Sequence, residues 1–217
     1  MILRISSVLN VPLRQQNVML QDAGYAPRFP DSGFGGVPSA IRFAIERMLE
    51  KQEPYPMSVL NSSYDIIASN KASQRFLAAG LSDQRMVTAP LNVFSLVFDP
   101  QLMRPRIKNW EEVAKAMLMR LQREVLQHAR HAGLTSLLEP VLQYPAIPED
   151  WQSQDLAAPS EPTMVVILKH MDDEFRFFTT TTTFTAPRHA MLEEIQLESY
   201  FPLDEQTRVL CERMALG

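Results

Sequence analysis

The feature that most limits the folds open to this chain is a change of residue pattern near position 163. Three runs that are rich in β-branched and aromatic residues, or that alternate in polarity, follow at 163–170 (TMVVILKH), 175–186 (FRFFTTTTTFTA) and 193–201 (EEIQLESYF). Such runs are typical of strands, and the MDDE segment between the first two is typical of a turn. We therefore predict three consecutive strands in this part of the chain.

The third of these runs has the two-residue period of a strand. Its residues Ile195, Leu197, Ser199 and Phe201 alternate with the others and share one face. After it, Asp204 is placed to cap a final helix that extends to Met214.

Helical patterns dominate the middle of the chain. The segment 55–70 (YPMSVLNSSYDIIASN) is the exception, and it predicts two short strands around a turn at 61–63. Asn70 then caps a helix that ends at Gly80. The apolar spacing predicts helices over 39–50, 71–79, 91–99, 109–132 and 135–143.

The longest predicted helix, 109–132, ends at Gly133 and carries one apolar stripe. Asn109 and Glu112 have the spacing of a capping box at its start. A helix with a single apolar stripe packs that stripe against the rest of the fold. The stripe consists of Trp110, Val113, Met117, Leu121, Val125 and His128, at spacings of three and four residues.

Two strands, several helices and three more strands place the chain in the α+β class. The order resembles that of PAS and PAS-like domains, in which a five-stranded antiparallel sheet is interrupted by a helical insert. In that arrangement the sheet closes over the helices and an apolar cavity lies between them. We expect this architecture here, together with a small N-terminal helical remnant.

The first thirty residues differ from the rest. They predict a helix in 1–10 and a second helix from about residue 13 to the C′ glycine Gly24. The segment 31–38 (DSGFGGVP) holds three of the seven glycines and is typical of a linker. We therefore divide the chain into 1–30, the linker 31–38 and a domain over 39–217.

Composition excludes several classes of protein. The 217 residues carry a net charge of −4, and apolar residues make up 46%, which favours a folded globular chain over a disordered one. A single cysteine, Cys211, allows no intramolecular disulfide and fits a reducing compartment. No apolar run approaches the roughly 18 residues that a membrane span needs. We expect a soluble, cytoplasmic protein without a membrane partner.

The sequence offers no convincing catalytic or metal site. His128 and His131 share a helix face, and His170 lies near Asp172 and Asp173, but neither group has an obvious set of further ligands. Nucleophile-elbow and phosphate-binding glycine motifs are missing from the sequence. We expect a protein that is not an enzyme and that has no metal or other cofactor.

The remaining chemical signal is apolar. Twelve methionines suit an adaptable apolar surface, and the aromatic residues exceed what one sheet face needs. A packed core would use the same residues, so both interpretations stay open. Arg104 and Arg106 could pair with a ligand carboxylate, or they could be ordinary surface arginines. The candidate ligand-binding residues are Phe94, Phe98, Arg104, Arg106, Trp110, Met117, Leu121 and Phe178.

Specific motifs carry a resemblance to a known family. The string at 8–27 (VLNVPLRQQNVMLQDAGYAP) resembles the end of a lambda-repressor-type (Xre-like) helix-turn-helix domain. The segments Tyr55–Asn70, Asp99–Glu112 and 175–210 resemble the opening hairpin, the start of the long helix and the closing strands and helix of the MmyB-like transcription regulator ligand-binding domain. Ser69 departs from that pattern, where a tryptophan is frequent.

The resemblance implies a transcription regulator with an N-terminal DNA-binding domain and a PAS-like sensor that holds a fatty-acid-like ligand. The recognition helix, the third of about five in such a DNA-binding domain, is not in this sequence, so we expect DNA binding only through a complete helix-turn-helix domain. We further expect a homodimer that forms through residues 39–50. The alternative is a PAS-like interaction or dimerisation module with no natural small ligand.

Overall fold

The structure, a computed structural model, describes most of the chain. The described residues are 1–9, 11, 13–28, 37–81, 91–127, 132–152, 163–184 and 195–216. The helices are α1 (Ile2–Val8), α2 (Leu13–Asp22), α3 (Ser39–Gln52), α4 (Lys71–Gly80), α6 (Val93–Phe98), the 3-10 helix Arg104–Arg106, α7 (Trp110–Gln127), α8 (Ala132–Leu142) and α10 (Glu205–Leu216). The strands are β1 (Met57–Leu60), β2 (Ile66–Ser69), β3 (Thr163–His170), β4 (Asp173–Thr183) and β5 (Gln196–Pro202).

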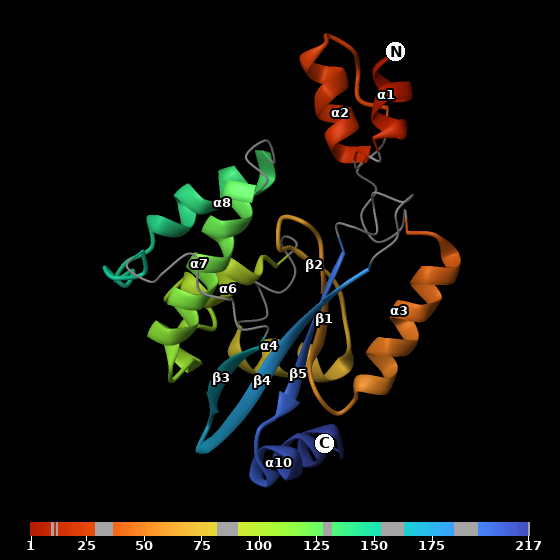
Figure 1. Ribbon diagram of the computed structural model, residues 1–217. Helices are drawn as coiled ribbons and strands as arrows, with labels where there is room; N and C mark the ends of the chain where they lie inside the picture. The colour runs from red at the N-terminus through yellow and green to blue at the C-terminus, as the bar shows by residue number, and fades with distance from the viewer. Residues whose placement is uncertain are drawn as a thin grey trace.

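The five strands form one antiparallel sheet in the order β2-β1-β5-β4-β3. The early strand β1 pairs with the late strand β5, so the two ends of the domain meet at the centre of the sheet (Figure 1). The helices α4, α6, α7 and α8 come between β2 and β3 in the sequence. This is the predicted α+β, PAS-like architecture, and it is confirmed.

Helices cover both faces of the sheet, and Figure 1 shows α3 and α7 on opposite sides of it. Successive residues of a strand point to opposite faces, and all four residues of β1 are buried. On the face that we call outer, Ile45 of α3 packs with Val59 and Leu197. On the inner face, Phe175 and Phe177 belong to one cluster with residues of α4, α6 and α7.

Local sequence signals set most of the element boundaries. Asn92 caps α6, because its side-chain oxygen accepts from the Phe94 N–H. Asp204 caps α10 in the same way, by accepting from the Thr207 N–H at 2.7 Å, as predicted. The segment between Tyr55 and Asn70 forms the predicted pair of strands.

The long predicted helix begins where predicted, directly after Asn109, but the Asn109 side chain does not cap it as expected and the helix ends earlier. The Asn109 amide binds β3: its oxygen accepts from the Ile167 N–H at 3.0 Å and its nitrogen donates to the Val165 carbonyl at 2.9 Å. The residue therefore tethers the start of α7 to the sheet. Gly133 lies inside the first turn of α8 rather than after the end of one longer helix, since glycine can also occur at a helix start. The histidines 128 and 131 lie outside the described residues.

The N-terminal helices pack against each other. Ser6 of α1 is fully buried, and its carbonyl accepts from the Val11 N–H at 2.8 Å. Gly24 has a φ of +78°, and the Tyr25 N–H donates to the Leu20 carbonyl, so α2 ends at the predicted C′ glycine. Most of the predicted linker, residues 31–36, lies outside the described residues, and the division into domains stays a prediction.

Asn70 joins three elements through one side chain. Its oxygen accepts from the Ser73 N–H as the cap of α4 and from the Met57 N–H at the start of β1. Its nitrogen donates to the Tyr55 carbonyl at 2.8 Å. The side chain is 5% exposed, so water cannot replace these partners.

We predict that Asn70→Ala destabilises the domain by about 2–4 kcal/mol, because it removes a helix cap and leaves a buried N–H and a buried carbonyl unpaired. Urea unfolding followed by circular dichroism measures the change. The control is Gln74→Ala, which removes an exposed amide from the same helix and should cost less than about 0.5 kcal/mol. Equal losses for the two variants would contradict the assignment.

Candidate functional site

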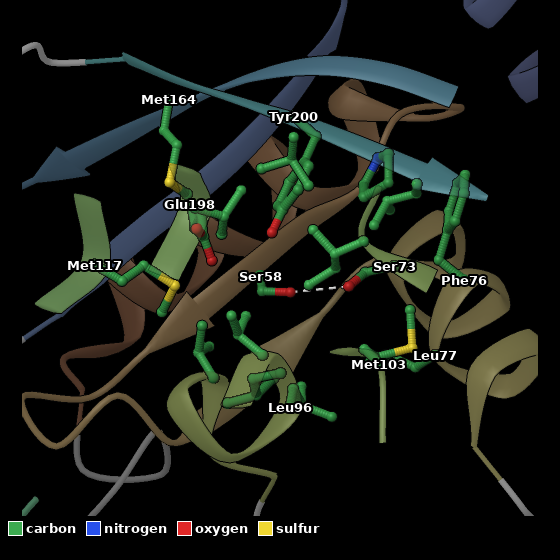
Figure 2. A pocket seen from close by; sticks show the side chains of 18 residues that line it. Ser58, Ser73, Phe76, Leu77, Leu96, Met103, Met117, Met164, Glu198 and Tyr200 are labelled. Carbon is green, nitrogen blue, oxygen red and sulfur yellow. Dashed lines mark hydrogen bonds between the residues drawn. The ribbon is translucent and has the colours of Figure 1, made fainter. Parts of the chain in front are cut away.

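A cavity of about 90 Å³ lies between the inner face of the sheet and the helices α4, α6 and α7, with a largely apolar wall (Figure 2). A cavity needs only roughly 10–15 Å³ to hold one water molecule, so this space is larger than an ordinary packing defect. It is lined by Pro56, Ser58, Ile66, Ser73, Phe76, Leu77, Val93, Leu96, Val97, Met103, Ile107, Val113, Met117, Met164, Val166, Leu168, Glu198 and Tyr200.

Two serines help to leave this space open. Ser58 of β1 and Ser73 of α4 face each other with their hydroxyl oxygens 2.8 Å apart (Figure 2), so the two hydroxyl groups bind each other. Larger side chains at these positions would fill the space between strand and helix.

Three methionines form the adaptable part of the wall, and they come from three different segments. Met164 lies on β3, Met117 lies on α7, and Met103 precedes the 3-10 helix. Gly80 makes room for Met103, because a Cβ at position 80 would lie 2.1 Å from its sulfur. Methionine side chains are unbranched and can change rotamer at low cost, so this part of the wall can adapt in shape.

Glu198 is the acidic group on the cavity wall. The register of β5 places it opposite Ser58 of β1 and Thr181 of β4, and the residue is 9% exposed. Figure 2 shows its carboxyl group directed toward the cavity. Burial raises the pKa of this carboxyl, and the charge of Arg120 opposes that shift. Compared with water, the protein environment around Glu198 therefore favours the neutral, protonated form of its carboxyl group.

Tyr200 brings a hydroxyl group to the same wall. It follows Glu198 by two residues on β5, so both side chains share the inner face. Burial raises the pKa of the phenol well above its ordinary value, and the charge of Glu198 adds to the shift. Tyr200 is thus a neutral hydrogen-bond donor at all physiological pH values.

Arg120 holds α7 over the strands next to this site. Its guanidinium group donates to Glu124 at 3.2 Å, to the Thr181 hydroxyl at 2.9 Å and to the Gln196 amide oxygen at 2.8 Å. The guanidinium carbon also lies 5.5 Å from the centre of the Tyr64 ring. Its three nitrogen atoms are therefore all engaged within the protein.

The structure separates most of the sequence-predicted apolar site residues from the cavity wall. Met117 is the one that lines it. Phe94, Phe98 and Leu121 are at most 1% exposed and form the core behind the wall, where the Phe94 and Phe98 rings stack at 5.9 Å. Trp110 packs against that core, and its indole N–H donates to the Val97 carbonyl at 2.8 Å.

Phe178 lies on the other side of the sheet. It stacks on Phe201 with ring centres 5.1 Å apart, and its neighbour Phe177 occupies the inner face. Adjacent residues of a strand cannot share a face, so one of the two phenylalanines had to point away from the helices.

The two predicted arginines bind the protein itself and do not line the cavity. The Arg104 guanidinium lies 3.6 Å from the centre of the Trp110 ring, and it donates to the carbonyls of Phe98 and Pro145. Arg106 contacts the ring nitrogen of His170 at 3.3 Å. Both side chains thus connect the 3-10 helix to neighbouring segments.

Sequence reasoning did not select Glu198, Tyr200 or the serine pair as site residues. The available signal was the alternation of the last strand. Because Leu197 and Ser199 share one face, Glu198 and Tyr200 must share the opposite one. A glutamate on the helix-covered face of a strand buried on both sides is an unusual placement that marks a position for inspection.

Residues 41–214 match the family model for the MmyB-like transcription regulator ligand binding domain, the part of the chain that contains the sheet, the helical insert and the cavity. The chain belongs to this family. A comparison with curated proteins finds no match.

Among solved structures, this MmyB-like domain is similar to the structure of an RNA-binding light-oxygen-voltage receptor, with 12% sequence identity and a TM-score of 0.36. That match covers 94% of this chain and 47% of the receptor chain, so the present chain spans about half of the receptor's length.

Metal sites and membrane spans are two further features that a chain of this kind could carry. The described residues contain no group of three or more histidine, cysteine, aspartate or glutamate side chains placed to hold a metal ion. Near His170, Asp173 forms an ion pair with Arg213 at 2.6 Å. Among the same described residues, none of the helices has the length and hydropathy of a membrane span.

We predict that Glu198→Gln raises the stability of the domain near neutral pH. Since the folded state holds the Glu198 proton more tightly than the unfolded chain does, the stability of the native protein falls as pH rises above the ordinary glutamate pKa of 4.5. The amide variant lacks this loss, so its advantage should grow between about pH 4.5 and pH 7.5. Urea unfolding at the two pH values measures the difference.

Glu174→Gln is the matched control, because Lys108 and Arg176 lower the pKa of that exposed carboxyl. Its removal should leave stability nearly unchanged or slightly reduced at pH 7.5. A Glu198→Gln protein whose stability relative to the native protein does not rise with pH would contradict the prediction.

Proposed function

We propose that this domain is the sensor of a transcription regulator, and that an apolar, fatty-acid-like molecule in its cavity modulates DNA binding by the full-length regulator. The observation that carries the proposal is the largely apolar cavity between the sheet and the helical insert of a regulator ligand-binding domain. Ligand sites in proteins are usually concave and mostly apolar, with a few polar groups that set orientation. The role that we propose is sensory and not catalytic.

The size of the cavity limits what it admits without rearrangement. An apolar cavity of about 150 Å³ holds a benzene molecule, whereas this one measures about 90 Å³. A long acyl chain therefore requires side chains of the wall to move. Met103, Met117 and Met164 can supply this movement, because rotamer changes of methionine open space without moving the backbone.

A route from the cavity to the N-terminal helices runs through α3. The Gln52 side chain at the end of α3 donates to the Tyr200 carbonyl at 3.0 Å, and Tyr200 lines the cavity. A ligand can change regulation only through different affinities for two arrangements of the protein. We propose that a shift of Tyr200 on ligand binding is passed to α3 through this hydrogen bond.

The segment before α3 supports the DNA-binding part of the proposal. We propose that α1 and α2 are the end of a helix-turn-helix domain, and that a complete domain of this type makes the DNA contacts. A homodimer through residues 39–50 would then place two such domains side by side, as paired half-sites in DNA require. Phe43 of α3 is 56% exposed and is available for that contact.

The second candidate function is an interaction or dimerisation module without a natural small ligand. The small volume of the cavity favours this alternative, because sites for drug-sized ligands usually measure about 300–1,000 Å³. Under this alternative, neither bound lipid nor stabilisation by added acids should be found.

We predict that the purified chain gains thermal stability from fatty acids of ten to eighteen carbons, and that Met164→Trp abolishes the gain by filling the cavity. A ligand at a hundred times its Kd contributes about 2.7 kcal/mol, which corresponds to roughly 5–10 °C in Tm for a domain of this size. Differential scanning fluorimetry measures the shift, and native mass spectrometry with organic extraction identifies any co-purified ligand.

Val165→Trp is the matched control, because the neighbouring side chain points to the outer face and is 41% exposed. That variant should respond to ligand like the native chain. An empty native protein that gains nothing from the whole panel of acids would favour the interaction module.

We also predict that the chain is a dimer, and that Phe43→Glu weakens the dimer at least about tenfold by placing a charge in the contact. Analytical ultracentrifugation of both proteins over a range of concentrations measures the dissociation constant. The control is Met171→Glu, in the exposed turn between β3 and β4. A monomeric native protein, or equal effects of the two variants, would exclude dimerisation through α3.

A further inference from the structure

A ligand with an apolar chain needs a partner for its polar end, and the wall residues show which partners are available. Among the described residues that line the cavity, Glu198 and Tyr200 are the two that can ionise. Arg104 and Arg106, which the sequence suggested as partners for a carboxylate, do not line it and bind other parts of the protein. The cavity wall thus offers an acid and a phenol to the head group of a ligand.

We infer that Glu198, with Tyr200 beside it, forms the head-group subsite of the cavity and selects apolar molecules whose polar end donates a hydrogen bond, an alcohol or an amine, over molecules that end in a carboxylate. This inference rests on the proposed function and narrows it: a fatty acid can still bind by sharing a proton with Glu198, but an alcohol or an amine with the same chain should bind more tightly.

The Glu198 carboxyl group faces the cavity and makes no hydrogen bond to another described residue. The side chain is 9% exposed, and its position opposite Ser58 puts it at the centre of the sheet. The nearest hydroxyl across the sheet, that of Ser58, lies 2.8 Å from the Ser73 hydroxyl oxygen and binds that group. A hydrogen-bond donor on a ligand would supply the partner that this carboxyl group lacks among the described residues.

The groups near Glu198 that titrate or carry charge are Arg120 of α7, Tyr64 before β2 and Tyr200 of β5. The two phenols are neutral, and the Arg120 nitrogens are engaged with Glu124, Thr181 and Gln196. The positive charge near Glu198 is thus that of Arg120, and Glu124 already forms an ion pair with it at 3.2 Å.

These groups treat the possible head groups differently. A neutral Glu198 can donate one hydrogen bond and accept another, which matches a hydroxyl group. An ionised Glu198 matches an ammonium group. A carboxylate anion would lie beside an acid in a buried site, where two carboxyl groups can bind only by sharing a proton, and this lowers its affinity near neutral pH.

The position of Tyr200 supports the same assignment. Its hydroxyl group points into the cavity in Figure 2, and its ring is fixed edge-on against Phe177 at 5.8 Å between ring centres. The phenol can donate to a ligand oxygen while Glu198 accepts from the same ligand group. An alcohol satisfies both residues at once.

The experiment compares three probes that have the same eight-carbon chain: 1-octanol, octylamine and octanoate. Isothermal titration of the full chain near pH 7 gives the affinity of each probe. We expect octanol or octylamine to bind at least about tenfold more tightly than octanoate. The ratio of octanol to octylamine distinguishes the neutral donor from the cationic one.

Glu198→Gln is the decisive variant, because an amide keeps the size and hydrogen-bonding capacity and removes the acid. Octanoate should bind this variant at least about tenfold more tightly than it binds the native protein, and octylamine should lose affinity. Tyr200→Phe, which keeps the ring, should weaken octanol binding several-fold. Glu174→Gln, at the start of β4 and not on the cavity wall, is the control and should leave all three affinities unchanged.

The outcomes separate this inference from the proposed function. If octanoate binds the native protein as tightly as octanol and Glu198→Gln changes nothing, the head-group assignment is overturned while ligand binding stands. If none of the three probes binds either protein, and both are folded by circular dichroism, the proposed function fails together with the inference that rests on it.

Discussion

The pairing of β1 with β5 is the contact on which the rest of this structure depends. It joins residues 57–60 to residues 196–199 and makes these two short strands the centre of the sheet. Central strands are covered on both faces, so their side chains must be compatible with burial on either side. On the outer face this requirement is met by Val59 and Leu197, which are fully buried. On the inner face the same register sets Ser58 beside Glu198, and this polar pair at the middle of the sheet is where the cavity opens.

The helical insert is held over that inner face by polar contacts at several points. Asn109, directly before α7, binds two backbone groups of β3, and Arg120 within α7 donates to Thr181 of β4 and Gln196 of β5. These contacts fix the position of α7 without side chains that would fill the space beneath it. A helix packed only through large apolar residues would approach the sheet until they interdigitate. The cavity therefore depends on two features: the positions of the polar contacts that hold α7, and the side chains of α7 that face the sheet.

The sequence predicted the elements better than it predicted the site, and the reasons are physical. Caps such as Asn70 and Asp204 and the β-rich runs act locally, so the element order and the PAS-like sheet followed from them. The site consists of the side chains that line the cavity and do not fill the core. Tertiary packing decides which side chains these are, and this is not a local property of the sequence. Phe94, Phe98 and Leu121 were candidates because they are large and apolar, but large apolar residues fill a core most efficiently and so lie behind the wall. The face of the sheet on which Phe178 lies is set by the register of β4, because a shift of one residue exchanges the two faces of a strand. The Arg104 guanidinium group packs on the Trp110 ring of the protein itself and not on a ligand carboxylate.

The buried carboxyl of Glu198 also suggests how the domain can respond to a ligand and not merely contain it. This group has no hydrogen-bond partner among the described residues and burial disfavours its charged form, so an ionised Glu198 lowers the stability of the arrangement that buries it. A ligand with a suitable donor removes that loss only in the arrangement that presents Glu198 to the cavity. Its binding energy is then different for different arrangements of β5, and such a difference is what allows a ligand to shift a conformational equilibrium. The backbone of the same strand accepts the Gln52 hydrogen bond from α3. A ligand that satisfies Glu198 therefore stabilises the strand to which the helix leading to the N-terminal segment is attached.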